Sequence, residues 1–446
     1  MSAIAQRLDV SARIAAAKNS PRFCVEGRVE KAVGQLLEIA GVDAPVGAEL
    51  VLEGSAGQVR VEVLGFRSGT LLAAPLGGTG GIAPGARVRV DMHAASIAVG
   101  AAMLGRIIDA FGRPLDGKPA PVCEGFSPVH APPPPAFGRK PIEELFDSGV
   151  RAIDGLLPLG RGQRLGLFAG AGVGKSTLLG MMCRSAAVDV VVVGLIGERG
   201  RELGDFVRNA LGPEGLAKSV VVAATSDQPP LVRARGALTA TAIAEHFRRQ
   251  GKEVLLVMDS VTRFAMALRE ATLAAGEPPL TKGYTPTVFA ALPALLERAG
   301  CGGPGEGTIT AIYTVLAEGD DLADPVADAV KGILDGHIVL ARGLADRGIF
   351  PAIDVLRSIS RVAPDVAPRS QLDVVSRLRD LLSAEEESRD LVRIGAYVAG
   401  SDPRIDMARM AVPKIEEMIK QRHDQATTRE EAYGALAAIA AMTGGT

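Results

Sequence analysis

The 446-residue chain is long enough for two to four domains, and its apolar fraction of 47% can fill their cores. The net charge is −2 with both signs interspersed, so the chain lacks the bulk basic field that attracts nucleic acid or an anionic membrane. Tryptophan is absent and aromatic residues make up 4% of the chain, so platforms for base stacking are scarce. These numbers argue against a nucleic-acid partner.

The cysteines and the apolar runs indicate the compartment. The four cysteines lie far apart without paired spacing, and the five histidines do not cluster near them. This distribution argues against structural zinc and for a reducing environment. The N-terminus lacks a long apolar core, and no apolar run approaches the roughly 20 residues of a membrane span. We therefore expect a cytoplasmic protein.

The first 94 residues predict a helix followed by a small closed β-barrel. Residues 2–18 carry Ile4, Leu8 and Ile14 among alanines, which favours an amphipathic helix; a frayed tail is the alternative. Six short β-patterned runs separated by Gly and Pro turns then suggest a barrel. These runs are Cys24–Val29, Gln35–Ile39, Glu49–Leu52, Val59–Gly65, Thr70–Ala73 and Arg87–Val90. We assign residues 1–20 to the helix and 21–94 to the barrel.

Two linking segments separate the barrel from the rest of the chain. Leu104–Lys118 is rich in glycine and aspartate and predicts a turn-rich connector. The proline-rich run Ala131–Ala136 predicts a stiff, polyproline-like link. A binding site for a proline-reading partner is the alternative for this run, and a plain spacer is favoured.

Beyond these links, strands and helices alternate in the pattern of a parallel sheet with helices on both faces. The predicted strands are Asp189–Ile196, Ser219–Ala224, Glu253–Met258, Gly307–Val315 and His337–Leu340, and the predicted helices are Arg201–Leu211 and Pro230–Gln250. Residues 369–446 are helical in pattern, broken at Gly400–Pro403 and Pro413, with a capping box at Thr428–Glu431. We expect an α/β fold in which residues 95–368 form the sheet core and residues 369–446 a C-terminal helical domain.

The core is organised around a phosphate-binding loop within Arg161–Thr177. The apolar run Leu165–Phe168 reads as a buried strand, and the helix starts near Ser176. Between them lie the loop residues Gly170, Ala171, Gly172, Val173 and Gly174. Backbone amides of such a loop and the helix N-terminus together hold an anion.

The residues that end this loop predict a magnesium–nucleotide site. Lys175 can reach the outer phosphates, and the hydroxyl of Ser176, followed by Thr177, can meet a nucleotide-bound Mg²⁺. Ala169 stands where the strict pattern has its first glycine, which is a small departure. A glycine-rich turn that binds nothing is the alternative.

Besides the phosphate loop, hydrolysis of a bound nucleotide needs three further groups: a carboxylate for the metal, a group that orients the attacking water, and positive charge near the transferred phosphate. Asp259 directly follows the predicted apolar strand Glu253–Met258, where its carboxylate can hold the water shell of Mg²⁺. Glu198 ends another strand at the same sheet edge, and we assign it to polarise the attacking water. Arg199 either contacts phosphate or forms a salt bridge at a helix start. Arg361, in a loop-like stretch, either reaches a neighbour's site or is an ordinary surface arginine.

Nine motifs in one order resemble the rotary-type ATPases, and more narrowly the protein-export ATPases of bacterial flagella and type III secretion systems. The motifs are Gly105–Asp109, Gly112–Gly117, the phosphate loop, Gly197–Glu202, Asp259–Phe264, Gly276–Pro279, Lys282–Pro286, Glu318–Asp321 and Ser358–Arg361. The resemblance spans about Val25 to Pro403. It implies a RecA-like core and a homohexameric ring with ATP at the subunit interfaces.

The resemblance also implies roles for individual residues. Lys175, Ser176 and Asp259 would bind MgATP, Glu198 would be catalytic, and Arg361 would complete the neighbour's site. Phe350 falls where related subunits carry an aromatic that packs on adenine, although a core phenylalanine is the alternative. The segment 276–286, with a lysine and a tyrosine, resembles the loop that faces the central pore of the ring.

Partners follow from the resemblance as well. In the family the N-terminal helix binds a dimeric stator-like regulator, and the C-terminal domain faces the central stalk protein, chaperone–cargo complexes and the membrane export gate. The function implied is ATP hydrolysis that energises flagellar protein export. The ATPase of an injection-type secretion system, a non-catalytic nucleotide-holding ring subunit and a ring-shaped nucleic-acid translocase are the alternatives.

Overall fold

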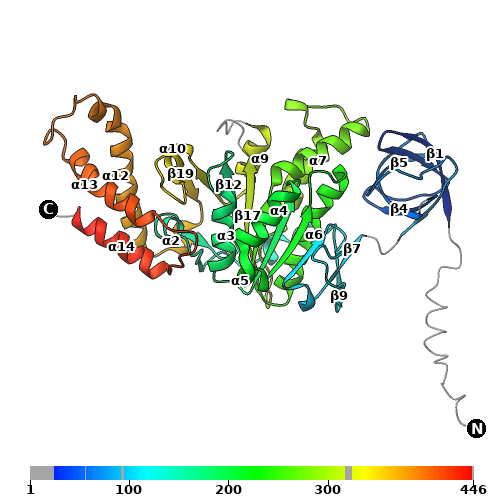
Figure 1. Ribbon diagram of the computed structural model, residues 1–446, viewed down its shortest axis with the longest axis horizontal. Coiled ribbons are helices and arrows are strands. Elements are labelled where there is room, and N and C mark those ends of the chain that lie inside the picture. The colour runs from blue at the N-terminus through cyan, green and yellow to red at the C-terminus, as the bar shows by residue number, and fades with distance from the viewer. Residues whose placement is uncertain (1–24, 56, 92–94, 317–323, 444–446) are drawn as a thin grey trace, which may run out of the picture. The chain divides into compact units, whose positions relative to one another are not determined.

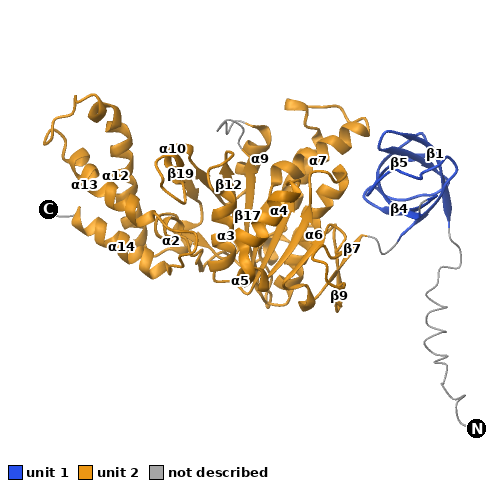
Figure 2. Cartoon of the chain, in the orientation of Figure 1, with its two compact units in different colours: residues 1–94 blue, residues 95–446 orange. Residues whose placement is uncertain are grey.

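The computed structural model describes residues 25–55, 57–91, 95–316 and 324–443. The chain divides into two compact units, residues 1–94 and 95–446 (Figure 2). The expected N-terminal helix, residues 2–18, and the motif 318–321 lie outside the described residues.

The first unit is the predicted barrel. Its six strands close in the order β1-β2-β5-β4-β3-β6 (Figure 1). They are β1 (Glu26–Val33), β2 (Leu36–Ala40), β3 (Glu49–Gly54), β4 (Gly57–Arg67), β5 (Thr70–Pro75) and β6 (Arg87–Val90). Alternate residues point inward, so Leu50 and Leu52 of β3, Val61 and Val63 of β4, and Ile39 of β2 form one buried core. All six strands were predicted within a few residues of their ends.

The second unit is built on a nine-stranded sheet in the order β19-β18-β12-β17-β15-β13-β14-β8, with β16 paired to β17. The strands are β8 (Arg106–Asp109), β12 (Arg164–Ala169), β13 (Val190–Ile196), β14 (Ser219–Ala224), β15 (Glu253–Asp259), β16 (Gly300–Cys301), β17 (Thr308–Leu316), β18 (Gly336–Leu340) and β19 (Ile353–Ser360). The seven strands from β18 to β8 are parallel, whereas β19 and β16 pair antiparallel. The expected parallel-sheet core is confirmed.

Helices cover both faces of this sheet, because successive strand residues alternate between two cores. Val191 and Val193 of β13 belong to the core that contains α3 (Lys175–Ser185) and the C-terminal helices. Val190 and Val192 belong to the core that contains α6 (Pro230–Arg249), α7 (Val261–Ala274), α8 (Pro286–Leu296) and α9 (Pro325–Ile333). The helices lie on either side of the strands in Figure 1. Every residue of β13 is buried, as a central parallel strand requires.

The remaining elements of the second unit are mostly helical. The helices are α2 (Arg151–Leu156), α3 (Lys175–Ser185), α4 (Gly200–Asp205), the π-helix η3 (Phe206–Leu211), α5 (Gly212–Ala217), α6 (Pro230–Arg249), α7 (Val261–Ala274), α8 (Pro286–Leu296), α9 (Pro325–Ile333), α10 (Arg342–Asp346) and α11 (Ala363–Val366). Short 3₁₀ turns are η1 (Ala101–Met103), η2 (Ala136–Gly138) and η4 (Thr281–Gly283), and two small sheets pair β7 (Ser96–Val99) with β9 (Gly125–Pro128) and β10 (Leu145–Phe146) with β11 (Leu159–Gly160).

Two segments predicted as irregular are strands at the sheet edges. Within the expected connector 104–118, β8 pairs in parallel with β14, and the ion pair between Arg106 and Asp116, 2.7 Å, holds the turn that follows. Likewise the loop-like stretch before Arg361 is β19, paired antiparallel with β18. Both predictions were wrong because an edge strand takes its hydrogen bonds from a neighbour distant in sequence, which a short local pattern does not reveal.

Three long helices end the chain: α12 (Arg369–Arg393), α13 (Pro403–Ile419) and α14 (Arg429–Met442). The predicted capping box is present, with Thr428 and Glu431 bonding reciprocally. The expected break at Pro413 is wrong, because α13 continues through it with Val412 and Ile415 buried on either side. Packing of this face outweighs the missing backbone hydrogen bond. Among the residues that the structure covers, no helix combines the length and apolarity needed to cross a bilayer.

Candidate active site

The phosphate loop has the predicted strand–loop–helix form. Strand β12 ends at Ala169, the loop covers residues 170–174, and α3 begins at Lys175. Gly172 and Gly174 have φ of 79° and 92°, a left-handed conformation that favours glycine. Ala169 is buried at 1% exposure, so the methyl group that departs from the usual pattern lies in the core.

A cavity of about 1200 Å³ opens at this loop, at the C-terminal edge of the sheet. Open α/β sheets bind their ligands at this edge. The predicted residues that line the cavity are Gly170, Ala171, Gly172, Gly174, Lys175, Ser176, Thr177, Glu198, Arg199 and Asp259. Val173, by contrast, is a buried core side chain at 1% exposure, so only its backbone can serve a ligand.

Three charged groups meet at the centre of the cavity. Lys175 Nζ lies 2.5 Å from Asp259 Oδ1 and 3.8 Å from Glu198 Oε1. Asp259 ends β15 and Glu198 follows β13, two strands paired in parallel, so their carboxylates reach the same edge. The Thr314 hydroxyl of β17 donates to Asp259 Oδ1 at 2.6 Å. The structure thus brings together the lysine and the two carboxylates that the sequence singled out.

Glu198 has the electrostatics of a base that works near neutral pH. Burial raises the pKa of its carboxyl to about 7, against the opposing effect of the Lys175 ammonium. A hydrogen bond to Glu202 and the charge of Asp259 raise it further. The same hydrogen bond lowers the pKa of Glu202. A carboxyl group tuned in this way can accept a proton from water at physiological pH.

The donor set fits a hydrated Mg²⁺ held between protein and phosphate. Ser176 and Thr177 are exposed in the cavity and Asp259 faces it. The described part of the chain contains no group of three or more His, Cys, Asp or Glu side chains that could hold a metal by itself. Mg²⁺ prefers few protein oxygens with water and substrate phosphates, so this sparse set suits it.

Two aromatic residues near the cavity differ in exposure. The Phe350 ring lies against the loop, where a Cβ added to Gly174 would sit 3.5 Å from it, and the side chain is 44% exposed. It is therefore not the core phenylalanine of the alternative interpretation. Tyr284, in the segment expected to face a pore, is buried at 5% exposure beneath Arg269, whose guanidinium lies 5.0 Å from the ring. Of the expected pair only Lys282 is exposed.

Comparison with known proteins identifies the family. The ATP synthase alpha/beta family, nucleotide-binding domain, matches residues 149–360, and the T3SS EscN ATPase C-terminal domain matches residues 367–438. The chain is 50% identical to the flagellum-specific ATP synthase of Pseudomonas aeruginosa, over 94% of this chain and 93% of the relative. This chain belongs to the family of flagellum-specific ATP synthases and type 3 secretion system ATPases. The resemblance seen in the motifs is confirmed.

Further relatives within this ATPase family support the assignment. The type 3 secretion system ATPase of Xanthomonas euvesicatoria is 46% identical, over 93% of each chain. The solved structure of the assembled ATPase EscN from enteropathogenic E. coli superposes with a TM-score of 0.87 at 42% identity, covering 93% of this chain and 100% of that chain. EscN in complex with its central stalk EscO superposes with a TM-score of 0.85, with the same identity and coverage.

Two of the predicted arginines lie outside the central charge cluster of this ATPase. Arg199 lines the cavity, but its side chain is 78% exposed and lies 3.8 Å from Glu202, as a helix-starting salt bridge would. Arg361 is not among the residues that line the cavity. It is exposed, and its Nη2 donates to the Lys331 carbonyl at 3.2 Å.

Two residues that contribute to the site were not predicted from the sequence. Arg342 of α10 donates to the carbonyl of Ala171 at 3.1 Å, across 171 positions of sequence. Thr314 of β17 holds Asp259 through its hydroxyl. No pattern distinguishes Thr314 in the sequence, because β17 also contains Thr308 and Thr310, and none distinguishes Arg342.

Proposed function

We propose that this protein hydrolyses ATP at the phosphate loop and uses the energy to drive export of flagellar proteins through a type III export apparatus. The observation that carries the proposal is the meeting of Lys175, Asp259 and Glu198 beside the loop. Together they supply phosphate binding, a metal-shell carboxylate and a base. The pKa of the Glu198 carboxyl, which burial raises to about 7, supports its assignment as the base.

The proposed mechanism assigns one task to each group. The loop amides and Lys175 hold the phosphates, which draws the ammonium away from Asp259. Ser176 and Asp259 would hold a Mg²⁺ ion beside the phosphates, and the ion would supply positive charge to neutralise the charge that develops on them. Glu198 accepts a proton from the attacking water. Phe350, half-exposed beside Gly174, packs on the adenine.

Arg361 acts in a neighbouring subunit of a homohexamer. Its exposure, and its position at the sheet edge away from its own cavity, support a role in trans. EscN, which assembles and binds its central stalk EscO, supports a ring with a stalk partner here as well. A stator-like regulator, chaperone–cargo complexes and an export gate complete the proposed partners, at the cytoplasmic face of the membrane.

Glu198→Gln tests the catalytic assignment. The variant removes the proton acceptor and keeps the shape, so turnover falls by about 10²- to 10⁴-fold while ATP still binds. Equal hydrolysis by variant and parent would leave only the nucleotide-holding role. Loss of motility on deletion, with injection-type secretion intact, tests the flagellar assignment.

A mixture of Lys175→Ala and Arg361→Ala subunits tests the shared site. Each variant alone lacks one half of every site. In a mixed ring, the loop of an Arg361→Ala subunit meets the arginine of a Lys175→Ala subunit, so activity returns. No recovery, with mixed rings demonstrated, would contradict the role of Arg361 in trans.

A further inference from the structure

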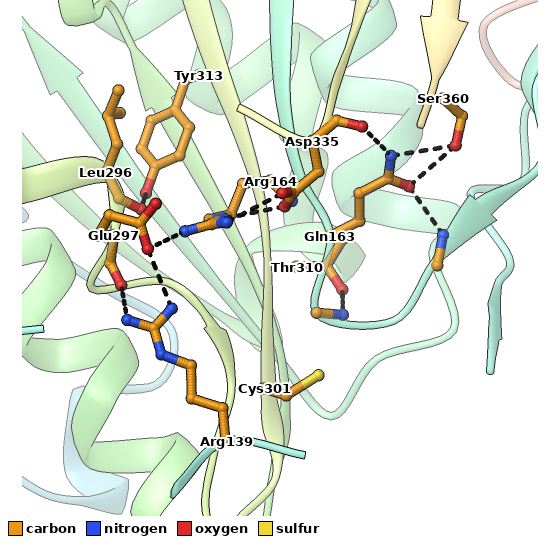
Figure 3. A network of polar contacts seen from close by, with 12 residues as sticks. Arg139, Gln163, Arg164, Leu296, Glu297, Cys301, Thr310, Tyr313, Asp335 and Ser360 are labelled. Carbon is orange, nitrogen blue, oxygen red and sulfur yellow. Dashed lines mark hydrogen bonds and ion pairs between the residues drawn. The ribbon is translucent and has the colours of Figure 1, made fainter. Parts of the chain in front are cut away.

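Figure 3 shows a partly buried polar network at the N-terminal edge of the sheet. The phosphate loop follows the other end of β12. The network joins the start of β12, the start of β18 and the end of β19, where Ser360 pairs with Gly336. Arg361 is the next residue after Ser360, so this network surrounds its backbone. The backbone N–H of Arg361 donates to the carbonyl of Asp335 at 2.9 Å.

Gln163 is the hub of this network. Its side chain is fully buried, at 0% exposure. Its Nε2 donates to the Asp335 carbonyl and to Ser360 Oγ, both at 3.1 Å, and its Oε1 accepts from the Gly160 N–H at 2.9 Å. Figure 3 shows the amide nitrogen of Gln163 between the Asp335 carbonyl and the Ser360 hydroxyl. One side chain therefore binds both the residue before Arg361 and the carbonyl that Arg361 itself uses.

The second partner, Asp335, is itself immobilised by Arg164. Its carboxylate accepts from Arg164 N at 3.0 Å and from Arg164 Nε and Nη2 at 2.9 Å each. Arg164 in turn pairs with Glu297. A guanidinium held between two carboxylates in a partly buried site is rigid, so the carbonyl shared by Gln163 and Arg361 is fixed in space.

Close packing of the two strands adds to this rigidity. A Cβ added to Gly336 would lie 2.4 Å from the carbonyl oxygen of Ile359 and 3.2 Å from Gln163 Nε2. Glycine alone lets β18 approach the end of β19 at this point. The Arg361 side chain, in contrast, forms no ion pair with an acidic group of the described residues and donates to a backbone carbonyl. The network therefore holds the backbone of Arg361 in place, whereas its guanidinium can turn toward a neighbouring subunit.

We propose that Gln163 is a positioning residue that fixes Arg361 for its task in the neighbouring subunit. This inference rests on the proposed function, in which Arg361 acts in trans. An arginine that stabilises a transferred phosphate acts through placement, and a misplacement of about 1 Å costs on the order of 10²-fold in rate. Gln163 does not line the cavity at the phosphate loop, so we expect its effect to reach the reaction through Arg361.

The test uses the mixture of Lys175→Ala and Arg361→Ala subunits. Gln163→Met is introduced into only one of these two subunit types at a time. Methionine keeps the length of the side chain and removes both N–H donors. In the Lys175→Ala subunit, which supplies the arginine, the substitution lowers kcat of the mixture by about 10- to 100-fold and leaves KM for ATP near its parent value. In the Arg361→Ala subunit, which supplies the loop, the fall is much smaller.

This asymmetry separates positioning from general structural damage. Equal falls in both halves, or no fall in either, would overturn the proposal. An inactive parent mixture would instead overturn the role of Arg361 in trans, and this proposal with it. Gln371→Met, at another buried glutamine in α12, is the matched control and is expected to show no asymmetry. Ser360→Ala, which removes one partner of Gln163, is the second variant should Gln163→Met not fold, and it gives the same asymmetry with a smaller fall.

Discussion

Lys175 Nζ lies 2.5 Å from Asp259 Oδ1 and so connects the first residue of α3 to the last residue of β15. Both side chains are largely buried, at 15% and 5% exposure. Before a nucleotide binds, the ammonium is neutralised by protein carboxylates. In the proposed mechanism, an entering phosphate would replace Asp259 as the partner of the lysine and would leave the carboxylate for the metal shell. The site therefore exchanges one charge pair for another, which avoids exposing an unpaired buried charge.

The first prediction concerns the hydroxyl that holds Asp259. Thr314→Val removes a buried donor to a carboxylate at unchanged side-chain shape, so we expect a loss of about 1–3 kcal/mol in unfolding free energy. Affinity for MgATP also falls, because Asp259 is no longer held. Denaturant unfolding and nucleotide titration measure the two effects. Thr241→Val, which breaks a bond within α6 to Ala237, is the control and costs less. Equal losses for the two variants would contradict this account.

The second prediction is the pH dependence of hydrolysis. Because burial raises the pKa of Glu198 to about 7, the base is ionised only above neutral pH, and kcat/KM for ATP rises as the pH passes about 7. The profile of Glu198→Gln lacks this limb. ATP titrates identically in both assays, so the difference between the two profiles isolates the residue. Superimposable pH profiles would exclude Glu198 as the base.

The third prediction concerns stability at the same residue. The pKa of Glu198 is 4.5 in the unfolded chain and about 7 in the folded protein. Its favourable contribution to the free energy of unfolding is therefore fully present below about pH 4.5 and is lost as the pH rises through 7. A neutral amide avoids that loss. We expect the Tm of Glu198→Gln, relative to the parent, to increase between pH 5 and pH 8. A constant difference in Tm would show that burial does not raise this pKa.

The fourth prediction concerns Phe350. Stacking of a base on an aromatic ring is worth about 1–3 kcal/mol, so Phe350→Ala raises KM for ATP by about 5- to 150-fold with a smaller change in kcat. Phe350→Tyr retains the ring and restores KM. Phe137→Ala, at an exposed phenylalanine in η2, is the control and leaves KM unchanged. An unaltered KM in Phe350→Ala would remove the adenine-packing role.

The fifth prediction concerns a buried ion pair away from the site. Arg298 donates to both carboxylate oxygens of Glu245 at 2.8 Å, and the side chains are 1% and 3% exposed. Arg298→Met leaves Glu245 buried without its cation and costs about 3–5 kcal/mol of unfolding free energy. Arg404→Met, which breaks the exposed pair with Asp380, costs far less. Thermal unfolding of both variants ranks them, and the reverse order would contradict the burial argument.

The parts of the fold that local patterns encode were predictable. Each barrel strand is a short run bounded by turn residues, and the phosphate loop has a spacing that its backbone conformation demands. Glu198 and Asp259 were found because each ends an apolar run that parallel pairing carries to one edge. In such cases the physics that forms the element acts within about ten residues of sequence.

The features that were missed depend on contacts between distant segments. Strand β8 forms only because the edge of β14 offers it hydrogen bonds, and Arg342 reaches Ala171 only in the folded core. Tyr284 is buried beneath Arg269, although glycine and proline neighbours favoured an exposed loop. Gln163 was not predicted as a functional residue, because a single glutamine before strand β12 forms no recognisable motif. Tertiary packing overrides local propensity at each of these positions.

The closed topology of the N-terminal barrel has a consequence for crowding. Among the described residues of this unit, strand β1 pairs with both β2 and β6, so the sheet has no terminal strand with free backbone donors and acceptors. Copies of this unit that are brought close together therefore cannot extend one another's sheets, and side chains alone decide whether they adhere. Such a module can be held at high local concentration without seeding cross-β aggregation.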